Sequence, residues 1–343
     1  MPVPALPEIR IVKNIDQDEI LQWLRDLRLK AYTPSSGYNV AAIFAMKRKH
    51  DVVLAGGVNV ECFDHRLSSH GETAAISLLA TVFGKKMVLD EGWTLGAPKS
   101  LTGPSNNPLG DKSGTTCGAC RQHINEFVRS GQVVINSVAM NGQRETNSLD
   151  VLLPYGFSFN NFDPDIVEAI ASAREEKTDF DLETIHGRVV RTETQTPVEI
   201  LNWLQSLEAI DYASGLNHVV ILRLSNGVYV AGVKVENAAY VGTSAMQSAL
   251  ANAVTIYGDA DITEIYTFGQ GAEATEDLVY PIPLSGLQGL QEFVTTDPKR
   301  IPVTMFTASG DSITIGLGQA TSLSTNFAHP AYRLNAGKLS VAG

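Results

Sequence analysis

An internal repeat constrains the fold of this chain more than any other feature of its sequence. EILQWL at 19–24 recurs as EILNWL at 199–204, and LAGGVNVE at 54–61 is echoed by VAGVKVE at 230–236. The two patterns keep the same order in both halves of the chain. Helix and strand patterns that recur in step over this distance predict a duplicated unit and therefore two domains of like fold.

Each copy is predicted to alternate helices and strands. In the first copy, hydrophobic periodicity predicts helices near 17–30 and 70–83 and strands near 39–47 and 51–60. This alternation is typical of α/β folds. The polar sequence between the copies, with one helical pattern at 165–174, is interpreted as a linker. The predicted divisions are a catalytic domain over 1–160, a linker over 161–195 and a non-catalytic domain over 196–343.

Length and charge exclude several classes of protein. The 343 residues suffice for two hydrophobic cores, and a net charge of −11 without a basic run would repel nucleic acid. No segment approaches the roughly 18 uninterrupted apolar residues of a membrane helix, and the N-terminus lacks the basic start and apolar core of a signal peptide. We therefore expect a cytoplasmic protein with neither nucleic acid nor membrane as partner.

One long segment of the first copy, 92–114, is rich in Gly, Pro, Ser and Asn. We expect most of it to lack regular structure. A loop of this length inside a compact domain is uncommon and often functional, so a lid over a site and an ordinary surface excursion both stay open.

Two of the three cysteines lie three residues apart at the start of a helical pattern, CGACRQHINEFVRSG. This spacing places the thiols of Cys117 and Cys120 on one turn, within reach of one ion, and the positive end of a helix dipole lowers thiol pKa values. Thiolates suit zinc. A redox dithiol and two unremarkable thiols remain as alternatives.

A zinc site needs a further ligand, and His70 is the best candidate among seven histidines. It precedes Glu72 by two residues at the start of a predicted helix, where the two side chains diverge by about 200°. One can therefore bind metal while the other acts on water. His123 is the rival because it follows the cysteines closely, but six residues from Cys117 on one helix it should face away.

These residues together resemble the signature of the zinc deaminases, in which H-x-E is followed by C-x-x-C. The chain is similar to cytidine deaminases of the two-domain type, in which a degenerate copy follows an active one. The resemblance rests on AYTPSSGYNVAA at 31–42, VNVE at 58–61, HGETAAI at 70–76, CGACRQ at 117–122 and LLPYGF at 152–157. It implies a three-layer α/β fold, a mixed sheet flanked by helices, duplicated in one chain.

The resemblance also implies roles for individual residues. His70, Cys117 and Cys120 would hold one Zn²⁺ per chain, and Glu72 would take a proton from water and deliver it to the substrate. The remaining assignments concern substrate binding: Asn59 and Glu61 for the ribose hydroxyls, Tyr38 for the base, and the backbone N–H near Gly71 for the pyrimidine carbonyl.

Several positions depart from the family pattern. Tyr38 stands where the family usually has Phe, Gly71 replaces Ala, and Thr116 replaces a Pro before the first cysteine. The implied reaction is hydrolysis of cytidine or deoxycytidine to the uridine form with release of ammonia, in pyrimidine salvage. The departures leave a modified cytidine or another small amino-substituted heterocycle as the alternative substrate. Cys62 is expected to be a small buried residue and not a ligand.

The second copy lacks the zinc signature. Aligning VKVE with VNVE places Ala245 opposite His70 and Gln247 opposite Glu72, and no C-x-x-C follows residue 120. This copy is therefore predicted to bind no zinc. The resemblance further implies a homodimer, in which Tyr240 would reach a zinc pocket or simply pack at a domain interface.

Overall fold

The computed structural model describes most of the chain. The described residues are 8–102, 114–128, 133–159, 164–175, 180–239, 241–271, 278–323, 332–335 and 338–341. Tyr240 and most of the predicted insertion at 92–114 lie outside them. Among the helices of the described residues, none combines the length and the apolar character needed to cross a membrane.

The first half forms a six-stranded mixed sheet with strand order β1-β3-β2-β4-β5-β6. Only the pair β4 and β5 is parallel. The elements of this half, in chain order, are β1 (Ile9–Val12), α1 (Gln17–Leu27), η1 (Arg28–Lys30), β2 (Tyr38–Lys47), β3 (Val52–Val58), η2 (His65–Leu67), α2 (Gly71–Phe83), η3 (Gly84–Lys86), β4 (Glu91–Pro98), α3 (Gly118–Asn125), β5 (Val134–Val138), β6 (Arg144–Ser148) and α4 (Leu149–Leu152).

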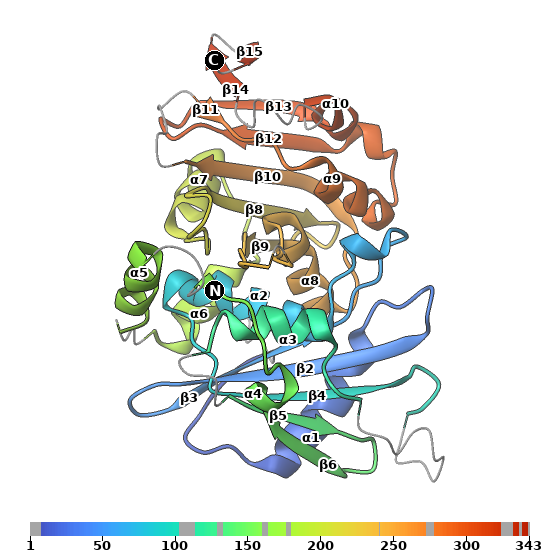
Figure 1. Ribbon diagram of the computed structural model, residues 1–343. Coiled ribbons are helices and arrows are strands. Elements are labelled where there is room, and N and C mark those ends of the chain that lie inside the picture. Colours follow the sequence, from blue (N-terminus) through green and yellow to red (C-terminus); the bar gives the residue numbers. More distant parts are fainter. Residues whose placement is uncertain are drawn as a thin grey trace.

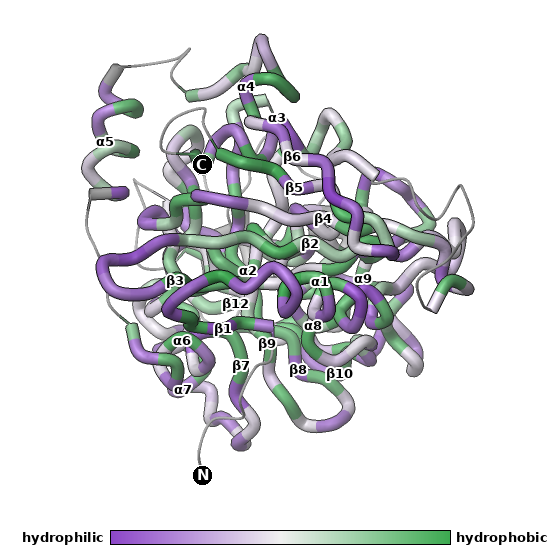
Figure 2. Tube along the Cα trace, turned by 90° about the horizontal axis from the view of Figure 1, so that it is seen from below, coloured by the Kyte–Doolittle hydropathy of each residue, from purple (hydrophilic) through white to green (hydrophobic). Residues whose placement is uncertain are grey.

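Helices cover both faces of this sheet. Two neighbouring glycines of β3 show this, because successive residues of a strand point to opposite faces. A Cβ on Gly56 would lie 2.5 Å from Leu27 of α1, whereas a Cβ on Gly57 would lie 2.1 Å from the backbone of Ala75 in α2. Hydrophobic residues fill the interior around α2, and the polar strand β6 lies at the edge (Figure 2). The arrangement has three layers.

The second half repeats the arrangement. Its sheet has the order β7-β9-β8-β10-β12-β13, again with one parallel pair, β10 and β12. The further elements are α5 (Pro164–Glu175), α6 (Leu182–Val189), β7 (Val190–Arg191), α7 (Pro197–Ser206), β8 (Asn217–Leu224), β9 (Tyr229–Val233), α8 (Ala245–Tyr257), β10 (Ile262–Gln270), β11 (Leu278–Val279), α9 (Leu284–Leu290), η5 (Gln291–Phe293), η6 (Pro298–Arg300), β12 (Pro302–Phe306), β13 (Ser312–Gly316), α10 (Leu317–Leu323), β14 (Tyr332–Asn335) and β15 (Lys338–Val341). The predicted α/β class and its duplication are confirmed.

The two halves pack through their equivalent helices, α2 and α8 (Figure 1). The contact is buried and partly polar: the Ser248 hydroxyl donates to Ser77 Oγ at 3.2 Å, and the Asn252 amide donates to Thr81 Oγ1 at 3.2 Å. Buried polar groups require such partners. One continuous cluster of buried side chains extends through both halves.

Two sequence-based expectations need correction. Residues 92–98 are not part of an irregular insertion but belong to β4, a central strand. Its glycines are needed for close packing, since a Cβ on Gly92 would lie 2.5 Å from the Phe44 ring. At Gly92 and Gly96, glycine therefore leaves room for the Phe44 and Tyr38 rings and does not indicate a loop.

The alignment of the two copies is the second correction. Gly57 packs on Ala75 in the first half, and Gly232 packs on Ala249 in the second, so the turn before the helix is one residue shorter in the second copy. Ser244, not Ala245, is therefore the counterpart of His70. Met246, not Gln247, is the counterpart of Glu72. The prediction that these positions offer no metal ligand set is unaffected.

Candidate metal centre and active site

Two helix N-termini bring the predicted metal ligands together. His70 is the N-cap residue of α2, and Cys117 is the N-cap residue of α3, which also carries Cys120 in its first turn. His70 Nδ1 lies 3.4 Å from Cys117 Sγ and 3.3 Å from Cys120 Sγ. Within the described part of the chain, these three are the group whose donor atoms lie close enough to share an ion.

The donor set fits zinc. For tetrahedral bonds of about 2.3 Å to sulfur and about 2.0 Å to nitrogen, sulfur and nitrogen should lie roughly 3.5 Å apart. The observed separations of 3.3 and 3.4 Å are close to this value. Two thiolates and a neutral imidazole also balance the charge of a dication, so the site needs no further charged residue beside it. The residue after Glu72 is the neutral Thr73, in agreement with this balance.

The thiols favour a bound cation for a second reason. Hydrogen bonds from Cys120 and His70 lower the pKa of Cys117 to about 3. The same pairing with Cys117, together with burial, raises the pKa of Cys120 well above its ordinary value. One thiolate is therefore stable alone, but a second beside it requires a positive charge, as a metal ion supplies.

Glu72 lies beside these donors in the first turn of α2. Its side chain is 5% exposed. Burial raises its pKa above the usual range of a carboxyl group, although its own backbone N–H and His70 oppose the shift. A carboxyl group with a raised pKa in a shielded site is suited to both accept and donate a proton near neutral pH.

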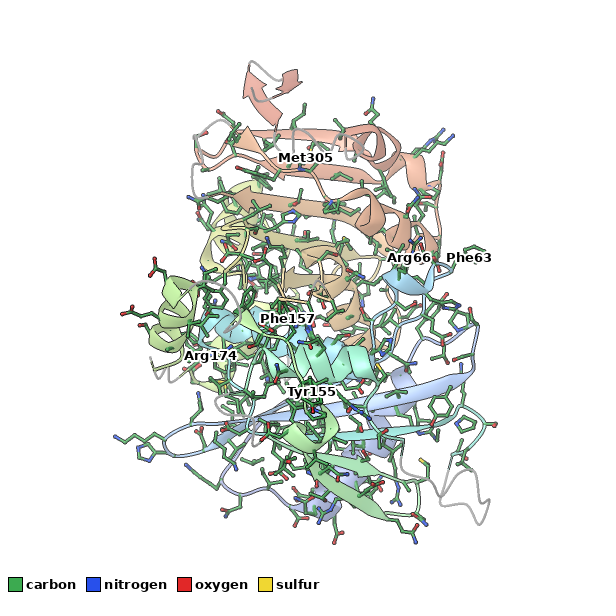
Figure 3. All side chains as sticks on the ribbon, viewed as in Figure 1. Phe63, Arg66, Tyr155, Phe157, Arg174 and Met305 are labelled. Carbon is green, nitrogen blue, oxygen red and sulfur yellow. The ribbon has the colours of Figure 1, made fainter. Side chains whose placement is uncertain are left out.

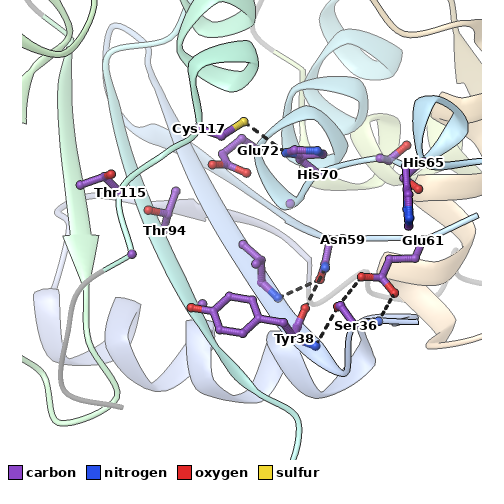
Figure 4. A pocket seen from close by; sticks show the side chains of 16 residues that line it. Ser36, Tyr38, Asn59, Glu61, His65, His70, Glu72, Thr94, Thr115 and Cys117 are labelled. Carbon is purple, nitrogen blue, oxygen red and sulfur yellow. Dashed lines mark hydrogen bonds between the residues drawn. The ribbon is translucent and has the colours of Figure 1, made fainter. Parts of the chain in front are cut away.

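A cavity of about 530 Å³ opens in front of His70, Glu72 and Cys117 (Figure 4). This volume is in the range of small-molecule sites. The residues predicted from the family pattern for substrate binding, Tyr38, Asn59, Glu61 and Gly71, all line it. It is also lined by Ser36, Val40, His65, Ser68, Ser69, Thr94, Gly96, Gly114 and Thr115.

Asn59 and Glu61 are held in place by backbone groups. The Asn59 amide accepts the Val40 N–H at 2.7 Å and donates to the Tyr38 carbonyl at 3.0 Å. Glu61 accepts the N–H groups of Ser35 and Ser36 at 3.1 and 3.0 Å, and also the Ser36 hydroxyl. Partial burial raises the pKa of Glu61, but these hydrogen bonds outweigh it and the net shift is downward. An ionised, fixed acceptor results.

Tyr38 forms a wall of the cavity and is 41% exposed. Its ring faces Gly96 of β4, where a Cβ would lie 2.8 Å from the ring edge. A side chain at position 96 would therefore displace the ring. Burial raises the pKa of the Tyr38 hydroxyl, so it stays protonated as a donor.

The remaining predicted residues have varied outcomes. His123 is fully buried and packs edge-on against the Phe127 ring, and it is not among the three clustered metal donors. Cys62 is buried, as expected. His65, Ser68, Thr94 and Thr115 line the cavity without having been predicted. His65 begins the 3₁₀ helix η2, Thr94 lies on β4, and Ser68 and Thr115 lie outside regular elements. The hydrophobic periodicity of the sequence gives no signal for a cavity at these places.

Comparison with known proteins gives structural matches alone. No protein-family model matches the chain, and no curated protein is found to be similar. Among solved structures, cytidine deaminase from Burkholderia pseudomallei is similar at 24% identity with a TM-score of 0.33, over 42% of this chain and 100% of that one. Cytidine deaminase from Mycobacterium leprae is similar at 22% identity with a TM-score of 0.31, over 41% and 99%. We therefore base the function on the donor set and the cavity.

Proposed function

We propose that the chain is a hydrolytic deaminase of a cytosine nucleoside, cytidine or deoxycytidine, acting in pyrimidine salvage. The observation that carries the proposal is the buried Glu72 carboxyl group beside a His, Cys, Cys donor set, at one end of a cavity of about 530 Å³. A purely structural zinc site would gain nothing from a carboxyl group placed beside it.

His70, Cys117 and Cys120 would hold the zinc ion. When bound, zinc supplies a Lewis acid that lowers the pKa of water. Glu72 would accept the proton that water loses and deliver it to ring nitrogen N3. It would then take the second proton from the oxygen now bonded to C4 and pass it to the amino group, which leaves as ammonia. The bond from C4 to the amino nitrogen breaks, a bond from C4 to oxygen forms, and no electrons are gained or lost.

The other end of the cavity suits a sugar. The fixed Glu61 carboxylate offers an acceptor for hydroxyl groups, beside Asn59 and the Ser36 hydroxyl. Tyr38 would pack along the base. Gly71 lines the cavity at the N-terminus of α2, the positive end of the helix dipole, and its backbone N–H would bind the pyrimidine carbonyl. These groups would orient the nucleoside so that its amino group faces Glu72.

One observation favours a second candidate substrate. The Tyr38 hydroxyl extends toward Gly114, where a Cβ would lie 3.6 Å from it, and Thr94 and Thr115 add hydroxyl groups to the same cavity. A base with an additional polar substituent would find partners there. A modified cytidine, or another small amino-substituted heterocycle, is therefore the alternative.

The experiment is an ultraviolet assay of the zinc-loaded protein against free cytosine, cytidine, deoxycytidine, 5-hydroxymethylcytidine, adenosine and guanine. We expect turnover of cytidine or deoxycytidine. Turnover of the modified nucleoside alone would favour the alternative, and no ammonia release from any compound would contradict both. Glu19→Gln, on an exposed face of α1, serves as the control for active-site substitutions.

The remaining inferences from the sequence are part of this proposal. We infer a homodimer, a cytoplasmic location and the domain divisions 1–160, 161–195 and 196–343. In the structure, β7 at Val190–Arg191 already belongs to the second sheet. Sedimentation equilibrium would test the dimer, and limited proteolysis would test the divisions.

A further inference from the structure

One loop of the first half forms the wall of the cavity that leads up to the metal donors. Residues 60–69 connect β3 to α2, and two main-chain hydrogen bonds between Val60 and Ser69, of 2.8 and 2.9 Å, close the base of this loop. Glu61, His65, Ser68 and Ser69 of this loop line the cavity. The loop ends at Ser69, directly before His70, the N-cap residue of α2.

The tip of the loop is fixed by a residue of the second half. The Phe63 N–H donates to both carboxylate oxygens of Glu292 in η5, at 2.8 and 3.0 Å. The Phe63 ring is 91% exposed and extends outward beside Arg66 (Figure 3), so packing of the ring cannot hold the tip. A hydrogen bond to an ionised acceptor is among the stronger contacts available to a backbone N–H.

A second contact from the same half holds the end of η2 within the loop. Gln247 of α8 donates from Nε2 to the Leu67 carbonyl at 3.2 Å. Its Oε1 accepts the N–H and hydroxyl of Ser244, at 3.1 and 2.9 Å, which fixes the amide orientation. Gln247 therefore links the N-terminus of α8 to the loop.

Close packing accompanies these two hydrogen bonds. Gly289 of α9 lies against the loop, where a Cβ would be 3.7 Å from Cys62 Sγ and 3.8 Å from Leu67 Cβ. Cys62 is 1% exposed, and burial, with the negative charges of Glu292 and Asp64, raises its pKa to about 12. The thiol thus packs as a small apolar group between the loop and the second half.

We propose that Gln247 and Glu292 are positioning residues, through which the second half sets the sugar-side wall of the first half's cavity. This inference rests on the proposed function, because the wall is assigned to the sugar only if the substrate is a nucleoside. Among the residues that the structure describes, the second half adds none to the metal donors and none to the lining of this cavity. It contributes the placement of Ser68 and of Glu61 and His65, the two that Figure 4 labels.

Two substitutions test the proposal with little effect on folding. Gln247→Glu keeps an oxygen acceptor for Ser244 but loses the donor to Leu67. Glu292→Ala removes the acceptor for Phe63, Glu292→Gln restores one oxygen acceptor, and Gln291→Ala is an exposed neighbouring control. We expect KM for the nucleoside to rise about five- to twentyfold in Gln247→Glu and Glu292→Ala, as when a fixed hydrogen bond is lost. We expect kcat and zinc content to stay within twofold, and Glu292→Gln to recover most of the loss.

Amide hydrogen exchange gives a readout independent of turnover. Peptides covering 61–69 should exchange faster in Gln247→Glu and Glu292→Ala, with no change in Gln291→Ala or in peptides of α1. Unchanged exchange would contradict the inference that Gln247 and Glu292 hold the loop in place. Faster exchange with unchanged KM would overturn its role in substrate binding. If the parent protein turns over no nucleoside, the proposed function fails, and the exchange result alone still decides whether the second half holds the loop.

Discussion

The two halves of the molecule share one scaffold and differ at the helix N-terminus that faces each cavity. In the first half, α2 is preceded by His70 and begins with Gly71 and Glu72, whereas α8 is preceded by Ser244 and begins with Ala245 and Met246. Both N-cap residues serve their helix: the His70 N–H donates to Thr73 Oγ1 at 2.9 Å, and Ser244 bonds to Gln247.

The cavities differ in the same way. The second half has a cavity of about 440 Å³ at the equivalent place, lined by Ser214, Lys234, Glu236, Thr243 and Ser244 among others. Glu236 accepts the N–H groups of Ala213 and Ser214, as Glu61 accepts those of Ser35 and Ser36. The carboxylate and its loop are thus part of the scaffold. The donor set and the buried Glu72 belong to the first half, and the described lining of the second cavity has no equivalent of them.

Removing the metal donors should have the largest effect on this comparison. We expect one zinc ion per chain, because the second half lacks the donor set. Cys117→Ser combined with Cys120→Ser should remove zinc and all measurable turnover, as should exhaustive chelation. Elemental analysis of the purified protein measures this. Two tightly bound zinc ions per chain, or an unchanged content in the double variant, would contradict the difference between the halves.

Glu72→Gln should separate chemistry from metal binding. The amide keeps the shape of the side chain but cannot move protons, so we expect turnover to fall about 10²–10⁴-fold, the usual contribution of one positioned acid–base group. Zinc content should stay at the parent level. Met246→Gln, at the equivalent place in the second half, is the matched control and should retain full activity. Activity of Glu72→Gln within tenfold of the parent would mean that another group moves the proton.

A pair of glycines tests whether the halves share their packing. A Cβ would lie 2.1 Å from the backbone of Ala75 at Gly57, and 2.1 Å from that of Ala249 at Gly232. Because a helix backbone cannot move away cheaply, we expect Gly57→Ala and Gly232→Ala each to lower the free energy of unfolding by roughly 3 kcal/mol. Gly187→Ala, with open space around it, is the control. Chemical denaturation measures all three. A difference above about 2 kcal/mol between the first two would show that the copies pack differently.

The sequence predicts the fold and the metal donors better than it predicts the cavity. Helix and strand patterns and the paired motifs are local signals, and they lead to α1, β2, β3, α2 and the cluster of His70 with the cysteines. Three features depend on contacts between distant residues and were missed. Gly92 indicates a loop in the sequence, but in the structure it makes room for the Phe44 ring. The turn before α8 is one residue shorter than its counterpart, which shifts the alignment of the two copies. Glu292 contacts Phe63, from which it is separated by 229 residues in the sequence.

The smallest effect should come from Lys234, the residue at the place of Asn59. Asn59 binds two backbone groups of its own half, whereas Lys234 forms an ion pair with Glu236 at 2.9 Å and donates to Ser214 Oγ at 2.6 Å. Burial raises the pKa of Glu236, but hydrogen bonds from Ser214 and Lys234 and the charge of Lys234 outweigh it, so the net shift is downward.

The sign of the pH dependence follows from that lowered pKa. A carboxyl group with a lower pKa in the folded than in the unfolded state stabilises the fold above its unfolded pKa, about 4.5, and loses this contribution as the pH falls through the folded value.

Replacing Lys234 by Met should therefore lower the free energy of unfolding by about 1–2 kcal/mol at pH 7, because it leaves a partly buried charge with fewer partners. The difference between Lys234→Met and the parent should shrink below pH 4.5, as Glu236 becomes protonated in both. Urea denaturation at pH 7 and pH 4 measures it, with Lys13→Met on the exposed surface as the control. Deaminase activity should not change. A loss of stability equal at both pH values would mean that Lys234 acts through packing of its aliphatic chain, and a loss of activity would mean that the second cavity takes part in catalysis.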